Sequence, residues 1–320
     1  MNMGIENREK IVIALGGNAL QSGDKPATAE AQLETVKETC DSIAAISGMG
    51  YEIALVHGNG PQVGRILLAS ETAGDVTPSM PFDVCGAMSQ GYIGYHIQQC
   101  LKYALNKNNR NVPVVTVATQ MIVDGDDPAF QNPTKPIGAF YTEKEAQELS
   151  REKGYTMKED SGRGYRRVVA SPMPRRIVEI EAVKQLWDHS IVITCGGGGI
   201  PVVENPDGTL EGIAAVIDKD FAAELLAEQV DADILMILTE VEKVALDFNT
   251  PEQRMMSSMT LAEAVSHIED GQFPAGSMLP KVEAAMKFVR RFPEKKAVIT
   301  SLDKAVDALK GKTGTVLTFN

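Results

Sequence analysis

Three consecutive residues, Asp218-Lys219-Asp220, place one amine between two carboxylates, where an apolar run gives way to a helical pattern. Aspartate suits the first positions of a helix because its side chain accepts hydrogen bonds from the exposed N–H groups there. Lys219 would then be held by the aspartates and directed at an anion beyond the helix start. An ordinary charged helix cap explains the same residues, so both interpretations stay open for this segment alone.

Two further lysines have unusual sequence settings. Lys135 lies in the segment Asn-Pro-Thr-Lys-Pro, and Lys281 follows Gly-Ser-Met-Leu-Pro at a predicted helix start. A lysine at a helix N-terminus is unfavourable unless an anion is present. Taken singly, each lysine is more often a solvated surface group. Together the three lysines favour phosphoryl transfer, which requires positioning and charge compensation rather than covalent catalysis.

Three glycine-rich turns each follow a predicted buried strand, at residues 16–18, 57–64 and 196–199. Glycine lets backbone N–H groups approach a phosphate closely, and a following helix N-terminus adds positive potential. In an open parallel sheet, ligands bind at the carboxyl ends of the strands. Turn geometry alone explains one such turn, but three predict an anion-binding edge of the sheet.

The sequence lacks the motifs of several other familiar catalytic and binding sites. Gly311-Lys312-Thr313 has Val306 where a Walker A motif requires its first glycine, and the glycines of HGNGPQVG (57–64) are spaced one residue too widely for a dinucleotide fingerprint. The four histidines have no metal-ligand spacing, and no GxSxG nucleophile elbow is present. We interpret His57 as a strand-end residue rather than a catalyst.

Composition narrows the class of protein. The 320 residues are 43% hydrophobic, enough for a large core, and the net charge of −12 argues against a nucleic-acid-binding surface. Four scattered cysteines without a CxxC pair are typical of reduced thiols in a cytosol. The first ten residues are polar and the apolar runs are strand-length. We therefore expect a cytoplasmic protein without a signal peptide, membrane span or nucleic-acid partner.

The order of predicted elements indicates an α/β fold built from parallel βαβ units. The predicted strands are Lys10–Leu15, Tyr51–Val56, Val112–Val123, Ile191–Cys195, Asp233–Thr239, Ala297–Thr300 and Thr315–Phe319. The first predicted helix begins at about Pro26. The next ones cover Asp83–Asn106, Ile177–Asp188, Leu261–Ile268 and Val282–Arg290. Glycines in the second of these helices fit two interpretations equally, close packing such as that at a subunit interface, or local flexibility.

The segment Asp124–Arg176 interrupts this pattern. It carries five prolines, many charges and few apolar runs. A structureless loop of this length is uncommon in a compact domain. We predict an inserted subdomain or lid, with a helix over Thr142–Lys153 and β structure over Arg166–Ala170.

Several motifs together make the chain resemble the carbamate kinases, a group within the amino-acid kinase family, essentially from end to end. They include IVIALGGNAL (11–20), HGNGPQVG (57–64), FQNPTKPIG (130–138), EDSGRGYRRVVASPMP (159–174), AAVIDKDFAAELLA (214–227) and AGSMLPKVEAA (275–285). The segments NPTKP and SGRGYRRVV are the most specific, because they separate this group from acetylglutamate, aspartate and uridylate kinases.

The resemblance implies an open αβα sandwich with a mostly parallel central sheet and a small protruding subdomain. A single domain of residues 1–320 would divide into three parts. Residues 1–123 and 177–217 would hold carbamate or carbamoyl phosphate, 124–176 would form the protruding lid, and 218–320 would hold the nucleotide.

The resemblance also assigns site residues. The catalytic set would be Lys135, Lys219, Asp220 and Lys281, with Asp220 orienting the lysines. Phosphate and substrate would bind at Gly16, Gly17, Asn18, Gly58, Asn59, Gly60, Gly197 and Gly198. The nucleotide would lie near Asp218, Thr239 and Met278. The protein itself would supply no metal ligand, because Mg²⁺ arrives with ATP or ADP. The family is dimeric, so a homodimer is implied.

The implied reaction is reversible phosphoryl transfer between carbamoyl phosphate and MgADP, which gives ATP and carbamate, usually during breakdown of arginine, agmatine or purine derivatives. Carbamate is already an anion, so a site without a poised base suits it. Acetylglutamate also offers a carboxylate, so this argument stops at carboxylate-like acceptors. Two alternatives stay open: a paralogue that phosphorylates another small acid, and a non-catalytic nucleotide- or carbamoyl phosphate-binding regulator.

Overall fold

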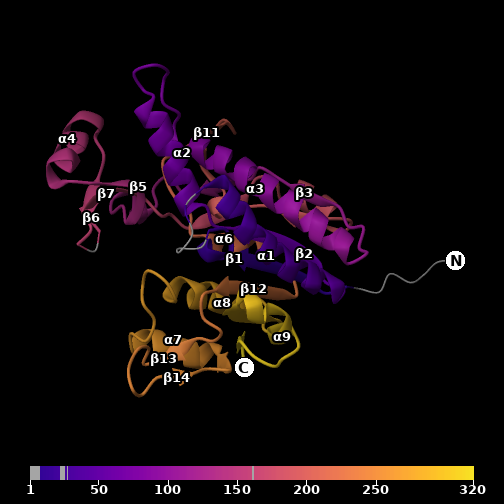
Figure 1. The fold of residues 1–320 in the computed structure, drawn as a ribbon. Helices are drawn as coiled ribbons and strands as arrows, with labels where there is room; N and C mark the ends of the chain where they lie inside the picture. The colour runs from indigo at the N-terminus through magenta and orange to yellow at the C-terminus, as the bar shows by residue number, and fades with distance from the viewer. Residues whose placement is uncertain (1–7, 22–25, 27, 161) are drawn as a thin grey trace.

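A computed structural model describes residues 8–21, 26, 28–160 and 162–320, and its centre is a mostly parallel sheet (Figure 1). Within these residues the sheet has eight strands, and one neighbouring pair, β16 with β17, is antiparallel. In spatial order they are β15 (Ser258–Thr260), β17 (Thr315–Thr318), β16 (Lys296–Ser301), β12 (Ile234–Thr239), β1 (Lys10–Leu15), β2 (Glu52–His57), β9 (Ile191–Ile193) and β3 (Val114–Thr116). The predicted α/β class with a mostly parallel sheet is confirmed.

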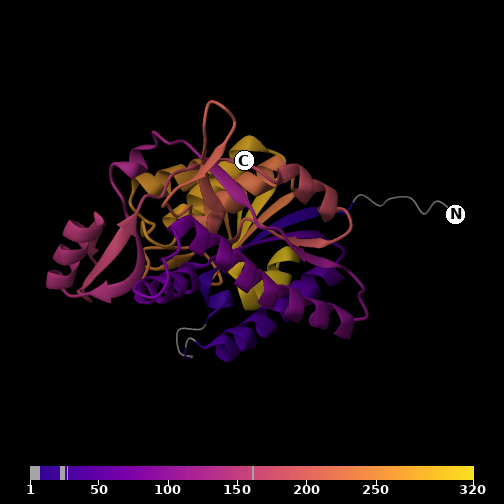
Figure 2. The ribbon, with the colours of Figure 1, turned by 90° about the horizontal axis from the view of Figure 1, so that it is seen from above.

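The described residues form nine helices, most of which pack in two layers, one on each face of this sheet. They are α1 (Ala29–Gly48), α2 (Gly60–Thr72), α3 (Phe82–Lys107), α4 (Glu143–Lys153), α5 (Ile180–Trp187), α6 (Lys219–Gln229), α7 (Leu261–Glu269), α8 (Leu279–Arg291) and α9 (Ala305–Leu309). Figure 2 shows the indigo and purple helices of the N-terminal third on one side of the strands and most of the orange ones on the other.

Strand β1 shows how the sequence produces these layers. Its apolar residues alternate between the two faces, as side chains of a strand must. Ile11, Ile13 and Leu15 join the core beneath α1 and α3, whereas Val12 and Ala14 join the core beneath α5, α6 and α8. A continuous apolar run therefore becomes a strand that is buried on both faces.

Two smaller sheets lie outside the central one. The first has the order β11 (Leu210–Gly212), β10 (Ile200–Glu204), β4 (Gln120–Val123) and β8 (Pro174–Ile177), and the second pairs β13 (Ala245–Leu246) with β14 (Arg254–Met255).

The insertion forms a small subdomain, which we call the lid, of residues 135–169. Its antiparallel sheet has the order β5 (Lys135–Tyr141), β7 (Tyr165–Val169) and β6 (Met157–Glu159), and it carries α4. Figure 1 shows the lid standing out at one side of the body, with α4 outermost. The predicted helix and β structure of this segment are confirmed within one residue at each end.

Several predicted boundaries are wrong, including the start of α8, which is Leu279 rather than Val282. The first helix begins at Ala29 rather than Pro26, because Thr28 is its cap and accepts a hydrogen bond from the N–H of Ala31. The predicted strand 112–123 is two strands in different sheets, β3 and β4, and Gln90 holds the bend by bonding the backbone of Thr119. The predicted helix 177–188 begins later, as α5, because residues 174–177 pair with β4.

A buried ion pair joins α6 to α8. The carboxylate of Glu224 has no exposed side-chain surface and lies 2.5 Å from the ammonium of Lys287. Its second oxygen has no hydrogen-bond partner. Burial raises the pKa of Glu224 to about 7, although the hydrogen bond from Lys287 opposes the shift.

This shift predicts a pH dependence of stability. Because the folded protein binds the Glu224 proton more tightly than the unfolded chain does, this group favours folding most below about pH 4.5. Its contribution is lost as the pH rises through about 7, a change of about 3 kcal/mol. We expect Glu224→Gln to flatten the decline in unfolding free energy between about pH 5 and 8, measured by urea denaturation. Glu269→Gln, which changes an exposed residue at the end of α7, should keep the wild-type slope. Equal slopes in all three proteins would contradict the assignment.

Candidate active site

Four parallel strands bring their carboxyl ends to the same edge of the central sheet. Strand β1 lies between β12 and β2, and β9 is the next neighbour of β2, all in parallel register. The turns at residues 16–18, 57–60 and 196–199 follow three of these strands, and Thr239 ends the fourth. The glycine turns that the sequence predicts as one anion-binding edge are therefore neighbours in space.

The centre of this edge is a buried carboxylate, Asp220, in the first turn of α6. Its side chain is 3% exposed and lies 2.5 Å from the ammonium of Lys219 and 3.1 Å from that of Lys281. Burial alone would raise the pKa of Asp220, but the charges and hydrogen bonds of the two lysines outweigh it and hold the pKa below its ordinary value. Asp220 is therefore an ionised bridge between α6 and α8.

Asp218 has a different partner from the one predicted. One of its oxygens caps α6 by accepting from the N–H of Asp220 at 3.0 Å, which confirms the predicted helix start. The other accepts from the ammonium of Lys135 at 2.9 Å, 83 residues away in sequence. The expectation that both aspartates hold Lys219 is thus half right, because Asp218 binds the lysine of the lid instead.

Three lysines and two aspartates consequently meet at the N-terminus of α6. Their formal charges sum to one positive charge, and the helix end adds positive potential. Lys219 and Lys281 are 14% and 16% exposed, so both ammonium groups lie largely out of bulk water. The cluster is therefore suited to binding an anionic group beside the helix end.

The first two glycine turns border this cluster. A Cβ atom on Gly58 would lie 3.6 Å from the side chain of Lys219, and one on Gly16 would lie 3.0 Å from the carbonyl oxygen of Leu238. A Cβ atom on Gly17 or Gly60 would meet open space. Asn18 lies in the short helix η1 (Gly17–Ala19), and its side chain falls outside the described part of the chain.

The third turn supports the other two. A Cβ atom on Gly197 would overlap the side-chain amide of Asn59, and one on Gly198 would overlap the carbonyl of Ile217, just before α6. Both glycines also have positive φ, at 68° and 95°. The structure thus places Gly197 and Gly198 behind Asn59 and the start of α6 rather than on open surface.

Gln90 is a residue that sequence reasoning missed. From α3 its amide donates to the carbonyls of Gly196 and Thr119, at 2.9 and 3.1 Å, and so ties the third glycine turn to the helix layer. A lone glutamine in a helical pattern carries no sequence signal for this role.

His57 lies beside Gly196, is 1% exposed, and has its pKa lowered to about 4 by burial. It is the last residue of β2, at the strand end where the sequence predicts it.

A cavity of about 480 Å³ opens between the carboxyl ends of β1 and β12 and the start of α8. It is lined by Gly16, Gly17, Ala19, Lys219, Leu238, Thr239, Glu240, Val241, Lys243, Ala245, Phe248, Met255, Pro274, Gly276, Ser277, Met278, Lys281 and Leu302. Thr239 and Met278 are therefore in one cavity with two of the three lysines, whereas Asp218 lies outside its lining. Phe248 and Met255, which the sequence did not suggest, come from the segment of the β13–β14 hairpin.

The described ranges contain no group of three or more His, Cys, Asp or Glu side chains that could hold a metal ion. All four cysteines are free and buried. None of the described helices is long and apolar enough to cross a lipid bilayer.

Comparison with known proteins agrees with this geometry. The sequence model of the amino acid kinase family matches residues 9–301. A carbamate kinase of Clostridium perfringens is 57% identical, over 96% of this chain and 98% of its own length. The carbamate kinase-like protein YqeA of Escherichia coli is 52% identical, over 97% and 99%.

A solved structure of carbamate kinase from Giardia lamblia bound to AMP-PNP superposes with a TM-score of 0.93 at 44% identity. The alignment covers 98% of this chain and 99% of that one. The extent of these matches, together with the lysine cluster at the carboxyl edge of the sheet, shows that the chain belongs to the amino acid kinase family.

Proposed function

We propose that this protein is a carbamate kinase, which transfers a phosphoryl group reversibly between carbamoyl phosphate and MgADP and so gives ATP and carbamate. The observation that carries the proposal is the convergence of Lys135, Lys219 and Lys281 on two aspartates beside glycine turns. The relatives named carbamate kinase, at about half identity or more over nearly the whole chain, support the choice of substrate.

Substrate binding and charge compensation fall to different residues. Carbamoyl phosphate would lie against the open glycines Gly17 and Gly60 and the amide of Asn59, with the nucleotide in the adjacent cavity. An ammonium group has three N–H donors. One donor of Lys219 points to Asp220, and two of Lys281 point to Asp220 and to the carbonyl of Ser277. Two donors of Lys219 and one of Lys281 therefore remain to bind oxygens of the phosphoryl group as its charge redistributes.

The chemistry needs little else from the protein. The attacking oxygen of carbamate is already ionised, so no general base has to remove a proton. Mg²⁺ enters as part of the nucleotide substrate, bound by phosphate oxygens. We assign nucleotide binding to residues 218–320 and carbamoyl phosphate binding to 1–123 and 177–217, with the inserted segment 124–176, which contains the lid, between them. We further propose a cytoplasmic role in ATP formation from arginine-derived or similar carbamoyl phosphate.

A coupled assay of ATP formation from carbamoyl phosphate and MgADP tests the proposal. Turnover supports it. Phosphorylation of another small acid, with carbamoyl phosphate inert, would favour a paralogous kinase, an alternative suggested by the carbamate kinase-like name of one relative. Binding of both ligands without turnover would favour a regulator.

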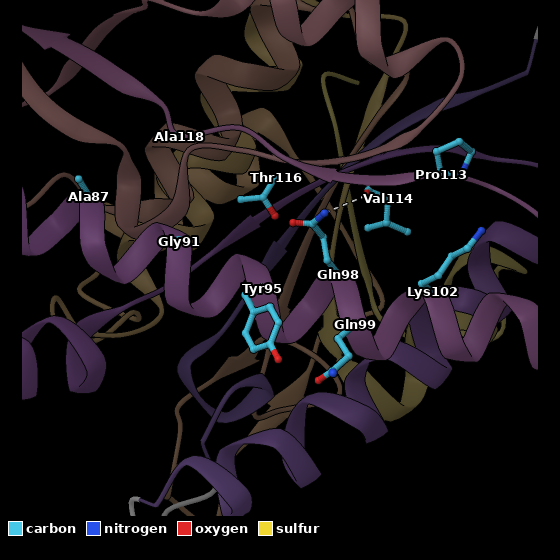
Figure 3. Close-up of a pocket in the computed structure, with 10 residues that line it drawn as sticks. All are labelled: Ala87, Gly91, Tyr95, Gln98, Gln99, Lys102, Pro113, Val114, Thr116 and Ala118. Carbon is cyan, nitrogen blue, oxygen red and sulfur yellow. Dashed lines mark hydrogen bonds between the residues drawn. The ribbon is translucent and has the colours of Figure 1, made fainter.

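We also propose a homodimer, with α3 and β3 as its interface. Strand β3 is an edge strand of the central sheet, and a hollow of about 770 Å³ lies between it and α3 (Figure 3). Along α3 the apolar side chains of Val84, Met88 and Tyr95 are 37%, 48% and 59% exposed. Gly91 lies among them and has open space where a Cβ atom would be. A second copy of α3 would approach closely at this glycine and cover the apolar stripe.

Removing the central cation tests the mechanism. We expect Lys219→Ala to lower kcat on the order of a thousandfold or more, because transition-state charge loses its compensation. Circular dichroism should stay close to wild type, while the unfolding midpoint falls because the buried Asp220 loses one of its two counter-ions. The surface variant Lys184→Ala serves as the control. An unchanged kcat in Lys219→Ala would remove this lysine from the mechanism.

Removing Lys135, the cation of the lid, tests separately whether the lid contributes to catalysis. We expect Lys135→Ala to raise KM for carbamoyl phosphate and to lower kcat, because the lid then brings no charge to the phosphoryl group. Steady-state kinetics with each substrate varied in turn measures both constants. If neither changes, the lid is not part of the site.

A charge on the α3 surface tests the dimer. We expect Gly91→Lys to shift sedimentation velocity from dimer to monomer, since two copies of the cation would face each other across the interface. Phe319→Glu changes the residue before the C-terminal one and should leave sedimentation unchanged, because Figure 1 shows the C-terminus at the opposite side of the molecule from α3. A wild-type monomer, or a dimeric Gly91→Lys variant, would contradict this interface.

A further inference from the structure

The segment SGRGYRRVV contains two adjacent arginines that the proposed phosphoryl site does not use. Adjacent residues on a strand point to opposite faces, and both lie on β7. Arg166 stays within the lid, where its guanidinium donates to the carbonyl of Gly138 and to Asp160, both at 3.2 Å. Arg167 points the other way, toward α2 of the main body.

Arg167 lies in a small cluster with Tyr155 and Glu71. Its guanidinium is 3.7 Å from the ring centroid of Tyr155, a cation–π contact, and 3.9 Å from the carboxylate of Glu71. The hydroxyl of Tyr155 donates to the same Glu71 oxygen at 2.7 Å. We call this group the clasp. Glu71 and Arg167 are only 15% and 16% exposed, so water screens the attraction between their charges less than it would in open solvent.

The members of the clasp come from both sides of the lid boundary. Glu71 is in the last turn of α2, whereas Tyr155 and Arg167 belong to the lid. Burial and the hydrogen bond to Glu71 raise the pKa of Tyr155 to about 12, so the phenol keeps its donating proton at any ordinary pH. The hydrogen bond from Tyr155 to Glu71 is therefore not lost through ionisation of the phenol.

Helix α2 connects this contact to the phosphoryl site. Its first residue, Gly60, belongs to the second glycine turn, and its 13 residues span about 18 Å. Near its start, Gly64 lies against Gly138 of β5, where an added Cβ atom would be 3.4 Å from the Gly138 nitrogen. Strand β5 thus rests on α2, and its first residue is Lys135, whose ammonium reaches Asp218.

We propose that Arg167 is a positioning residue, and that the clasp of Arg167, Tyr155 and Glu71 fixes the lid on α2 so that Lys135 faces the transferred phosphoryl group. This inference rests on the proposed function for its kinetic consequence and on the contacts alone for its structural one. The SGRGYRRVV segment would then contribute to the site by positioning the lid, without contacting the substrate.

Kinetics of Arg167→Met test the positioning role. We expect KM for carbamoyl phosphate to rise about tenfold and kcat to fall by a similar factor, while KM for MgADP stays within about twofold, because only the lid cation is displaced. Arg167→Lys, which keeps a cation for Glu71 without the planar stacking surface, should recover part of the loss. Arg163→Met is the matched control, since Arg163 lies in the same segment and pairs with Asp160 inside the lid; it should behave as wild type.

Hydrogen–deuterium exchange tests the same point without turnover. Arg167→Met should speed exchange across the lid residues 135–160 and leave α6 and α8 unchanged, whereas Arg163→Met should not. Tyr155→Phe, a smaller change that keeps the ring but removes the hydrogen bond, should act in the same direction. Wild-type exchange in both clasp variants, or an equal loss of affinity for both substrates, would overturn the inference. A wild-type protein inert toward carbamoyl phosphate would refute the proposed function, and exchange would still decide the clasp.

Discussion

The site depends on the ion pairs that the carboxylate of Asp220 forms with Lys219 and Lys281. This carboxylate is almost fully buried and binds two ammonium groups from two helices, so it lets like charges lie close together in a place with little water. Removing it would leave both lysines without a counter-ion, a large cost for partly buried charges. The lowered pKa of Asp220 shows that the cations more than offset its burial. A second pair one turn along, Glu224 with Lys287, joins the same two helices and keeps α8 in register with α6.

The third lysine comes from a part of the chain that the central sheet does not hold directly. Asp218 reaches it through the oxygen that is not used to cap α6. The start of α6 therefore carries both carboxylates that organise the cluster. The lid in turn rests on α2 through the Gly64–Gly138 contact and the clasp. Since α2 begins in a glycine turn, one helix links the backbone donors of the site to the lid that carries Lys135.

Sequence reasoning succeeded where a pattern has one physical cause. Apolar strand-length runs ending in glycine predicted the sheet and the edge at which the glycine turns meet, and Asp218 predicted the start of α6. It failed where the partner lies far away in sequence. Nothing local indicates that Asp218 binds Lys135, that Gln90 ties down the third glycine turn, or that Phe248 lines the cavity. The strand predicted over 112–123 failed because a buried side chain bends the backbone between two sheets.

In the proposed mechanism, three ammonium groups from the lid, α6 and α8 surround one migrating phosphoryl group. A crystal structure with MgADP and a planar fluoride mimic of that group tests this arrangement most directly. We predict that the Nζ atoms of Lys135, Lys219 and Lys281 lie within about 3.2 Å of the mimic, with Asp220 still bonded to the latter two. A mimic bound in the cavity while Lys135 or Lys281 points to solvent would contradict it.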